Sequence, residues 1–140
     1  AVIKEFYEAS QAGVQIDLIV RGTCCLKPGI TNVSENIRVV SVVGRFLEHS
    51  RVYHFLNAEH SVYCSSADLM ERNLSNRIEV CFPILKKKHA NRIIEELKVY
   101  LESPTQTWEL NFKGEYVERS RQENDQLDVQ TELLNKLTQT

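Results

Sequence analysis

Apolar residues along the chain follow two spacings, one typical of strands and one typical of helices. Two short β-branched runs, residues 14–20 and 37–43, contain almost no charge, which is typical of strands buried on both faces. Over residues 86–102 apolar positions recur every three to four residues and predict an amphipathic helix. We therefore expect one domain of mixed α/β class.

Turn-forming residues separate the remaining elements. Gly13, Pro83 and Gly114 mark the end of a helix, the end of a strand and the turn of a hairpin. The further elements that we expect are helices over residues 3–12, 69–74 and 121–139, strands over residues 52–55, 61–64 and 78–82, and an edge hairpin from Trp108 to Tyr116.

Composition narrows the class of protein. The 140 residues fit one ordinary domain, and 42% apolar with 26% charged residues is the mix of a globular chain. Seventeen Lys and Arg stand against nineteen Asp and Glu, so we expect no nucleic-acid partner, because such binders usually show a strong basic excess. The four cysteines form no C-x-x-C pair, which favours free thiols in a reducing, cytoplasmic compartment.

Arginine is concentrated in the first part of the chain. Residues 1–82 contain two lysines, at positions 4 and 27, but six arginines, at positions 21, 38, 45, 51, 72 and 77. Because guanidinium grips phosphate or carboxylate through two parallel donors, this pattern favours a focused anion site. The alternative is a set of surface ion pairs, and for two of these residues we expect Arg38 to pair with Glu35 and Arg45 with Glu48.

A histidine motif supplies the sharper chemical signal. His49-Ser50-Arg51 and the later Ser65-Ser66-Ala67-Asp68 resemble the second half of a phospholipase D motif, H-x-K followed by G-S-x-N. Such a set brings an imidazole, a cation and a hydroxyl around one phosphorus. Two features depart from that family: Leu56 stands where it has an acidic residue, and one motif copy is present where those enzymes need two histidines.

A narrower resemblance covers most of the chain. Five blocks in order are similar to bacterial polyphosphate kinase: residues 16–29 (IDLIVRGTCCLKPG), 34–39 (SENIRV), 44–51 (GRFLEHSR), 66–74 (SADLMERNL) and 77–80 (RIEV). The resemblance is to the C-terminal catalytic domain. It implies a phospholipase D-like mixed β-sheet flanked by helices, within a single domain over residues 1–140. Its core would span about residues 10–118, and residues 119–140 would form a C-terminal helical tail.

The resemblance also implies roles for six residues. Arg21 and His49 would contact the nucleotide phosphates, and His49 would be the second catalytic imidazole, opposite a phosphohistidine in a preceding domain. Arg51 and Arg77 would be further phosphate ligands. Ser66 and Asp68 would orient His49 or Arg51.

The whole enzyme, on this resemblance, would reversibly transfer the terminal phosphate of ATP to inorganic polyphosphate. We expect no metal ligand in this chain, because the Mg²⁺ ligands would lie in the upstream domain. We also expect the 140-residue chain alone to be inactive, with upstream domains of the same polypeptide as its partners and a homo-oligomer as the full-length form. The expected location is cytoplasmic, either free or peripheral to the inner membrane face.

Two other functions stay open at the level of sequence. One is a phospholipase D-like phosphodiesterase assembled from two chains, with a His49 from each. The other is a non-catalytic module that binds polyanions or nucleotides, in which Arg21 and Arg77 matter and His49 does not.

Overall fold

The computed structural model describes residues 1–103, 105–119 and 127–138. The chain divides into two compact units: Ala1–Glu48 with Val99–Thr140, and His49–Lys98. Each unit has its own sheet.

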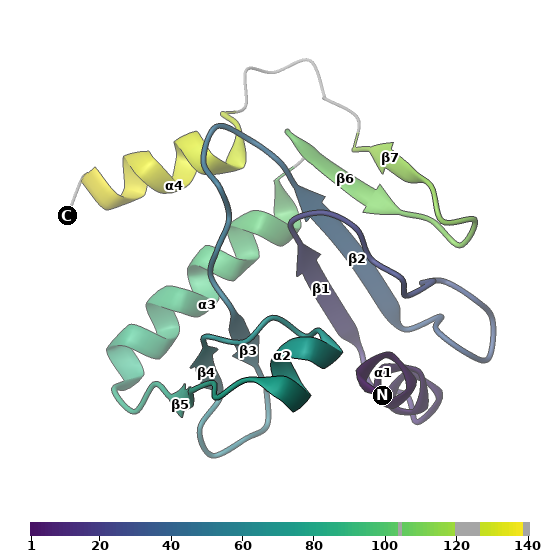
Figure 1. Ribbon diagram of the computed structural model, residues 1–140. Helices are drawn as coiled ribbons and strands as arrows, with labels where there is room; N and C mark the ends of the chain where they lie inside the picture. The colour runs from purple at the N-terminus through teal and green to yellow at the C-terminus, as the bar shows by residue number, and fades with distance from the viewer. Residues whose placement is uncertain (104, 120–126, 139–140) are drawn as a thin grey trace. The chain divides into compact units, whose positions relative to one another are not determined.

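The first unit is built on a four-stranded sheet in the order β1-β2-β6-β7 (Figure 1). β1 and β2 are parallel, whereas β6 and β7 are added as an antiparallel hairpin at the edge. The strands are β1 (Ile16–Val20), β2 (Ile37–Val42), β6 (Thr107–Leu110) and β7 (Tyr116–Glu118).

β2 is buried on both faces because its alternate residues enter two separate apolar clusters. Ile37 and Val39 pack on one side with Leu26 and with side chains of α1 (Val2–Gln11). α1 ends as predicted near Gly13, whose φ of 88° is a left-handed conformation that glycine adopts at little cost.

The opposite face of β2 packs against helical segments from the end of the chain. Val40 and Val42 contact Val99, in the last turn of α3 (Lys87–Glu102), and Val129, the first residue of α4 (Val129–Thr138). Since Val40 and Val129 are fully buried, this cluster fixes where α4 begins.

The second unit has a three-stranded antiparallel sheet in the order β3-β4-β5. The hairpin of β3 (Val52–His54) and β4 (Val62–Ser65) pairs with β5 (Cys81–Pro83) across β4. α2 (Glu71–Asn76) lies between β4 and β5 in sequence.

The mixed α/β class with flanking helices and a C-terminal helix is confirmed, with the strands divided between two sheets. Both hairpins and the helix over residues 86–102 are also confirmed. All four cysteines are free, as expected.

Three predicted boundaries need correction. The strand expected over residues 78–82 is Cys81–Pro83, and Ile78 is fully exposed outside it. Pro83 joins this strand because β5 lies at the edge of its sheet, where a missing N–H is tolerated. α2 begins two residues later than predicted, at Glu71. The last helix begins at Val129, and the predicted stretch over residues 121–126 lies outside the described residues.

Candidate functional site

Arg51 joins two of the predicted site residues in the second unit. Its Nε donates to Oδ1 of Asp68 at 3.0 Å, and its Nη1 donates to the backbone oxygen of His49 at 2.9 Å. The same Nη1 lies 3.1 Å from the imidazole Nδ1 of His49. One guanidinium therefore connects the histidine to the aspartate, although the three residues come from two separate loops.

This contact fixes the proton arrangement of His49. A guanidinium has donors only, so Nδ1 must accept, and a neutral His49 then carries its proton on Nε2. Because His49 is exposed, Nε2–H can face a ligand from solvent. The imidazole is thus held in the tautomer that can donate a proton or a hydrogen bond to a phosphate oxygen.

The loop that carries Asp68 is held by burial and by a local hydrogen bond. Ala67 is buried, and its N–H donates to the hydroxyl of Ser65 at 3.0 Å. The side chains of Arg51 and Asp68 are 18% and 34% exposed, so this ion pair is less screened by water than a pair at the open surface.

Ser66 makes its contacts on the far side of the same loop. Its hydroxyl donates to a carboxylate oxygen of Glu79 and accepts the N–H of Val80 at 3.0 Å. Its backbone N–H also donates to the oxygen of Val80. These contacts connect the loop to Glu79 and Val80, the two residues that precede β5.

Tyr53 lies in β3 next to this cluster. Burial raises the pKa of its phenol above the usual 10.0, and the charge of Cys81 adds to that rise. A hydrogen bond with Ser65 and the charge of Arg51 oppose the rise, so they act in the lowering direction. The phenol therefore stays protonated at neutral pH. Nothing in the sequence singles out Tyr53, which has the pattern of an ordinary strand residue.

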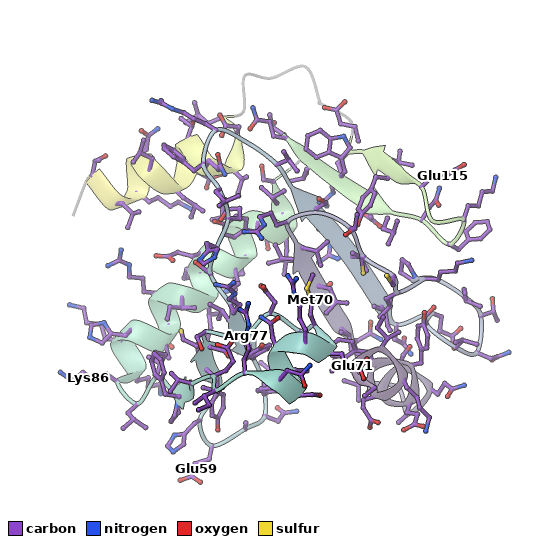
Figure 2. All side chains as sticks on the ribbon, viewed as in Figure 1. Glu59, Met70, Glu71, Arg77, Lys86 and Glu115 are labelled. Carbon is purple, nitrogen blue, oxygen red and sulfur yellow. The ribbon has the colours of Figure 1, made fainter. Side chains whose placement is uncertain are left out.

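Arg77 directly follows α2, at the end of the helix opposite to Met70 and Glu71 (Figure 2). Its side chain is exposed and, among the residues that the structure describes, has no ion pair. An arginine in this state is available to an anionic ligand.

Arg21 belongs to the first unit and directly follows β1. Its Nη1 donates to the backbone oxygen of Glu48 at 2.8 Å, across 27 residues of sequence. Arg21 and residues 42–48 line a shallow hollow of about 250 Å³. The bond to Glu48 uses one of five N–H donors, so the remaining donors of the guanidinium can serve a ligand in this hollow.

Arg38 has a different partner from the predicted Glu35, so that prediction is wrong. Its Nε donates to Oδ1 of Asp17 at 2.7 Å. Asp17 and Arg38 are paired positions of the parallel strands β1 and β2, and this register brings the two side chains together.

The predicted pair of Arg45 with Glu48 is also wrong. The guanidinium carbon of Arg45 lies 5.3 Å from the ring centre of Phe46, a cation–π contact. Glu48 instead accepts hydrogen bonds from uncharged side chains, Tyr100 and Gln130.

Within residues 1–103, 105–119 and 127–138, no group of three or more His, Cys, Asp or Glu side chains is placed to hold a metal ion. Mg²⁺ therefore does not fit a site made by these residues alone. No helix in the same ranges is long and apolar enough to cross a membrane.

Comparison with known proteins gives one consistent result. Residues 1–130 match the family model described as polyphosphate kinase C-terminal domain 2. A polyphosphate kinase of Pseudomonas aeruginosa is 54% identical over 138 residues, which cover 97% of this chain and 20% of that protein. A polyphosphate kinase of Bacillus cereus is 54% identical over 133 residues, covering 94% of this chain and 19% of that protein.

The fold agrees with the same family. The crystal structure of polyphosphate kinase from Porphyromonas gingivalis matches with a TM-score of 0.91 at 38% identity. The match covers 99% of this chain and 21% of that one. The chain thus spans about a fifth of the length of the relatives that it matches.

Proposed function

The chain belongs to the polyphosphate kinase family, and we propose that it serves as the C-terminal catalytic domain of an enzyme that moves the terminal phosphate of ATP reversibly onto inorganic polyphosphate. In the forward direction a histidine of a preceding domain attacks the γ-phosphorus, an N–P bond forms, and the P–O bond to ADP breaks. The terminal oxygen of polyphosphate then attacks the same phosphorus and releases the histidine.

His49 is the residue of this chain that acts on the transferred phosphate. The observation that best supports this role is the guanidinium of Arg51 held between His49 and Asp68. This arrangement leaves the Nε2 proton of His49 directed away from Arg51. As the P–O bond breaks, that proton stabilises the negative charge that develops on the leaving oxygen.

Three arginines supply the positive charge that phosphoryl transfer requires. Arg21 and His49 contact the nucleotide phosphates, while Arg51 and Arg77 bind further phosphate oxygens. Phosphoryl transfer depends mainly on positioning and on charge neutralisation, which suits donors with a planar, forked geometry. Asp68 holds Arg51 in place, and Ser66 fixes the loop that carries Asp68.

The remaining parts of the active site belong to the longer enzyme. The phosphorylated histidine and the Mg²⁺ ligands lie in the upstream domain. The 140-residue chain alone is therefore inactive, and the full-length enzyme is a homo-oligomer.

The test is polyphosphate synthesis from ATP by the full-length enzyme with His49→Ala. We expect a loss of at least about 100-fold, the lower range for removal of a general acid or base. The matched control is His54→Ala, which removes an exposed histidine of the same unit and keeps normal activity. Normal synthesis by the His49 variant would reject the proposal. Salt-sensitive polyphosphate binding without any His49-dependent turnover would favour a binding module instead.

A further inference from the structure

Glu48 is the anchor of Arg21, and its own side chain is held from two sides. Oε2 of the Glu48 carboxylate accepts the hydroxyl of Tyr100 at 2.9 Å, and Oε1 accepts Nε2 of Gln130 at 2.7 Å. Both donors are uncharged; Tyr100 belongs to α3 and Gln130 belongs to α4. The position of the Glu48 backbone oxygen, which binds Arg21, therefore depends on these two side chains.

Gln130 makes two more bonds to the same segment. Its Oε1 accepts the N–H of Phe46 at 2.8 Å, and its Nε2 donates to the backbone oxygen of Phe46 at 2.8 Å. The side chain is only 5% exposed and satisfies the backbone of a residue 84 positions away. Its neighbour Val129 is fully buried, so packing of Val129 holds the backbone at Gln130 in place.

The absence of a side chain at Gly44 makes this approach possible. A Cβ at Gly44 would lie 2.5 Å from Oε1 and 2.8 Å from Cδ of Gln130. Such contacts are not tolerated, and Gln130 cannot move aside without losing its bonds to Phe46 and Glu48. Gly44 lines the same hollow as Arg21, and its missing side chain leaves the room that the Gln130 amide occupies.

We propose that Gln130 is a positioning residue for nucleotide binding, which acts through Glu48 on Arg21. This inference rests on the proposed role of Arg21 as a ligand of the nucleotide phosphates. Tyr100 and Gln130 hold the carboxylate of Glu48. The backbone oxygen of Glu48 then fixes one edge of the Arg21 guanidinium. The other donors of that guanidinium then face an incoming phosphate without a further loss of rotamer freedom on binding. A purely structural role for Gln130 would lower stability and leave nucleotide affinity unchanged.

The experiment uses the full-length enzyme with Gln130→Glu, measuring KM for ATP, kcat and the equilibrium Kd for ADP. The substitution keeps the shape of the side chain but removes both Nε2 donations and places a second carboxylate against Glu48. We expect KM and Kd to rise about tenfold, as for the loss of one hydrogen bond to a charged group, with a smaller change in kcat. The matched control is Asn135→Asp, an amide-to-acid exchange at an exposed position of the same helix, which leaves all three unchanged.

Two further variants make the result decisive. Glu48→Gln combined with Gln130→Glu exchanges the acid and the amide, and we expect it to recover most of the lost ADP affinity. Tyr100→Phe removes the hydroxyl bond to Glu48 and keeps the aromatic ring, and we expect a rise in Kd of about two- to threefold. This milder variant gives the answer if Gln130→Glu does not fold.

The outcomes separate this inference from the function on which it rests. An unchanged Kd for ADP in a folded Gln130→Glu or Tyr100→Phe enzyme overturns the positioning role. If Arg21→Ala weakens ADP binding while those two variants do not, only the positioning role fails. If Arg21→Ala also leaves ADP binding unchanged, the proposed phosphate contact of Arg21 fails with it.

Discussion

The guanidinium of Arg51 donates to Asp68 at 3.0 Å while it also contacts the imidazole of His49 at 3.1 Å. Asp68 therefore acts on His49 through Arg51. We predict that Asp68→Asn lowers kcat of the full-length enzyme about tenfold or more, because a neutral amide holds the guanidinium less firmly and His49 loses its fixed tautomer. The steady-state rate of polyphosphate synthesis checks this.

A second aspartate offers a matched control for that substitution. Asp17 accepts from Nε of Arg38 at 2.7 Å, but both side chains are more exposed, at 44% and 38%. Asp17→Asn should leave the rate unchanged and cost less than about 1 kcal/mol in stability. Equal effects of the two substitutions on kcat would contradict a special role for Asp68.

Arg77 opens the RIEV block and is exposed directly after α2, and we propose it as a phosphate ligand. Arg77→Ala should raise KM for ATP or polyphosphate about tenfold, as for one lost charge-assisted contact. Arg72→Ala is the control, since it removes an exposed arginine inside α2, five residues before Arg77. Steady-state kinetics at two salt concentrations would measure both, and equal KM shifts would indicate a general charge effect.

The start of α4 should make stability depend on pH in the acidic range. Asp128 accepts the hydroxyl of Thr131 at 2.7 Å and the N–H of Thr131 at 3.0 Å. The hydroxyl bond is the main cause of the lowered pKa of Asp128; burial opposes it, and the backbone N–H groups add to it. With a folded-state pKa below the usual 3.8, the carboxylate stabilises the fold above that value. This contribution is lost as pH falls through the lower folded-state pKa.

Asp128→Ala should therefore cost about 1 kcal/mol of unfolding free energy at neutral pH, the usual loss for a helix cap. Urea unfolding at a series of pH values would show the difference from the unsubstituted chain shrinking as the carboxylate becomes protonated. A difference that stays constant down to the most acidic pH would contradict the assignment.

The centre of β2 should be sensitive to loss of volume. Val40 is a fully buried residue of β2 that packs with Val99 and Val129, so Val40→Ala should cost about 2 kcal/mol through lost burial and a residual cavity. Val43, three residues later, is 55% exposed, and Val43→Ala should change stability by less than about 0.5 kcal/mol. Denaturant midpoints of the two variants, compared side by side, test whether the buried core includes Val40 and ends before Val43.

Local patterns were enough to predict most elements of the fold. The assignments of β2 and α3 are correct because a continuous β-branched run is typical of a strand buried on both faces, and apolar positions every three to four residues are typical of a helix buried on one face. The strand predicted over residues 78–82 is wrong at its start, because the backbone oxygen of Val80 accepts from Ser66 in a loop and the strand begins only at Cys81. Such a contact depends on the tertiary position of the loop, which no local pattern reports.

Only part of the candidate site was within reach of sequence reasoning. The histidine motif predicts His49, Arg51 and Asp68 as site residues, and the structure brings these three together in one unit. By contrast, Gln130 and Phe46 are 84 residues apart and neither belongs to a motif. Their contact arises where α4 packs on β2, so it becomes visible only when the fold is known.

The central claim is that His49 acts on the transferred phosphate without itself becoming phosphorylated. Its most direct test is a rapid-quench, single-turnover measurement of label transfer from γ-phosphate-labelled ATP to the full-length enzyme, with and without His49→Ala. We predict that label appears on the variant at least about 100-fold more slowly but still reaches a histidine outside residues 1–140. Transfer at the normal rate, or label recovered on a peptide containing His49 in the unsubstituted enzyme, would contradict the claim.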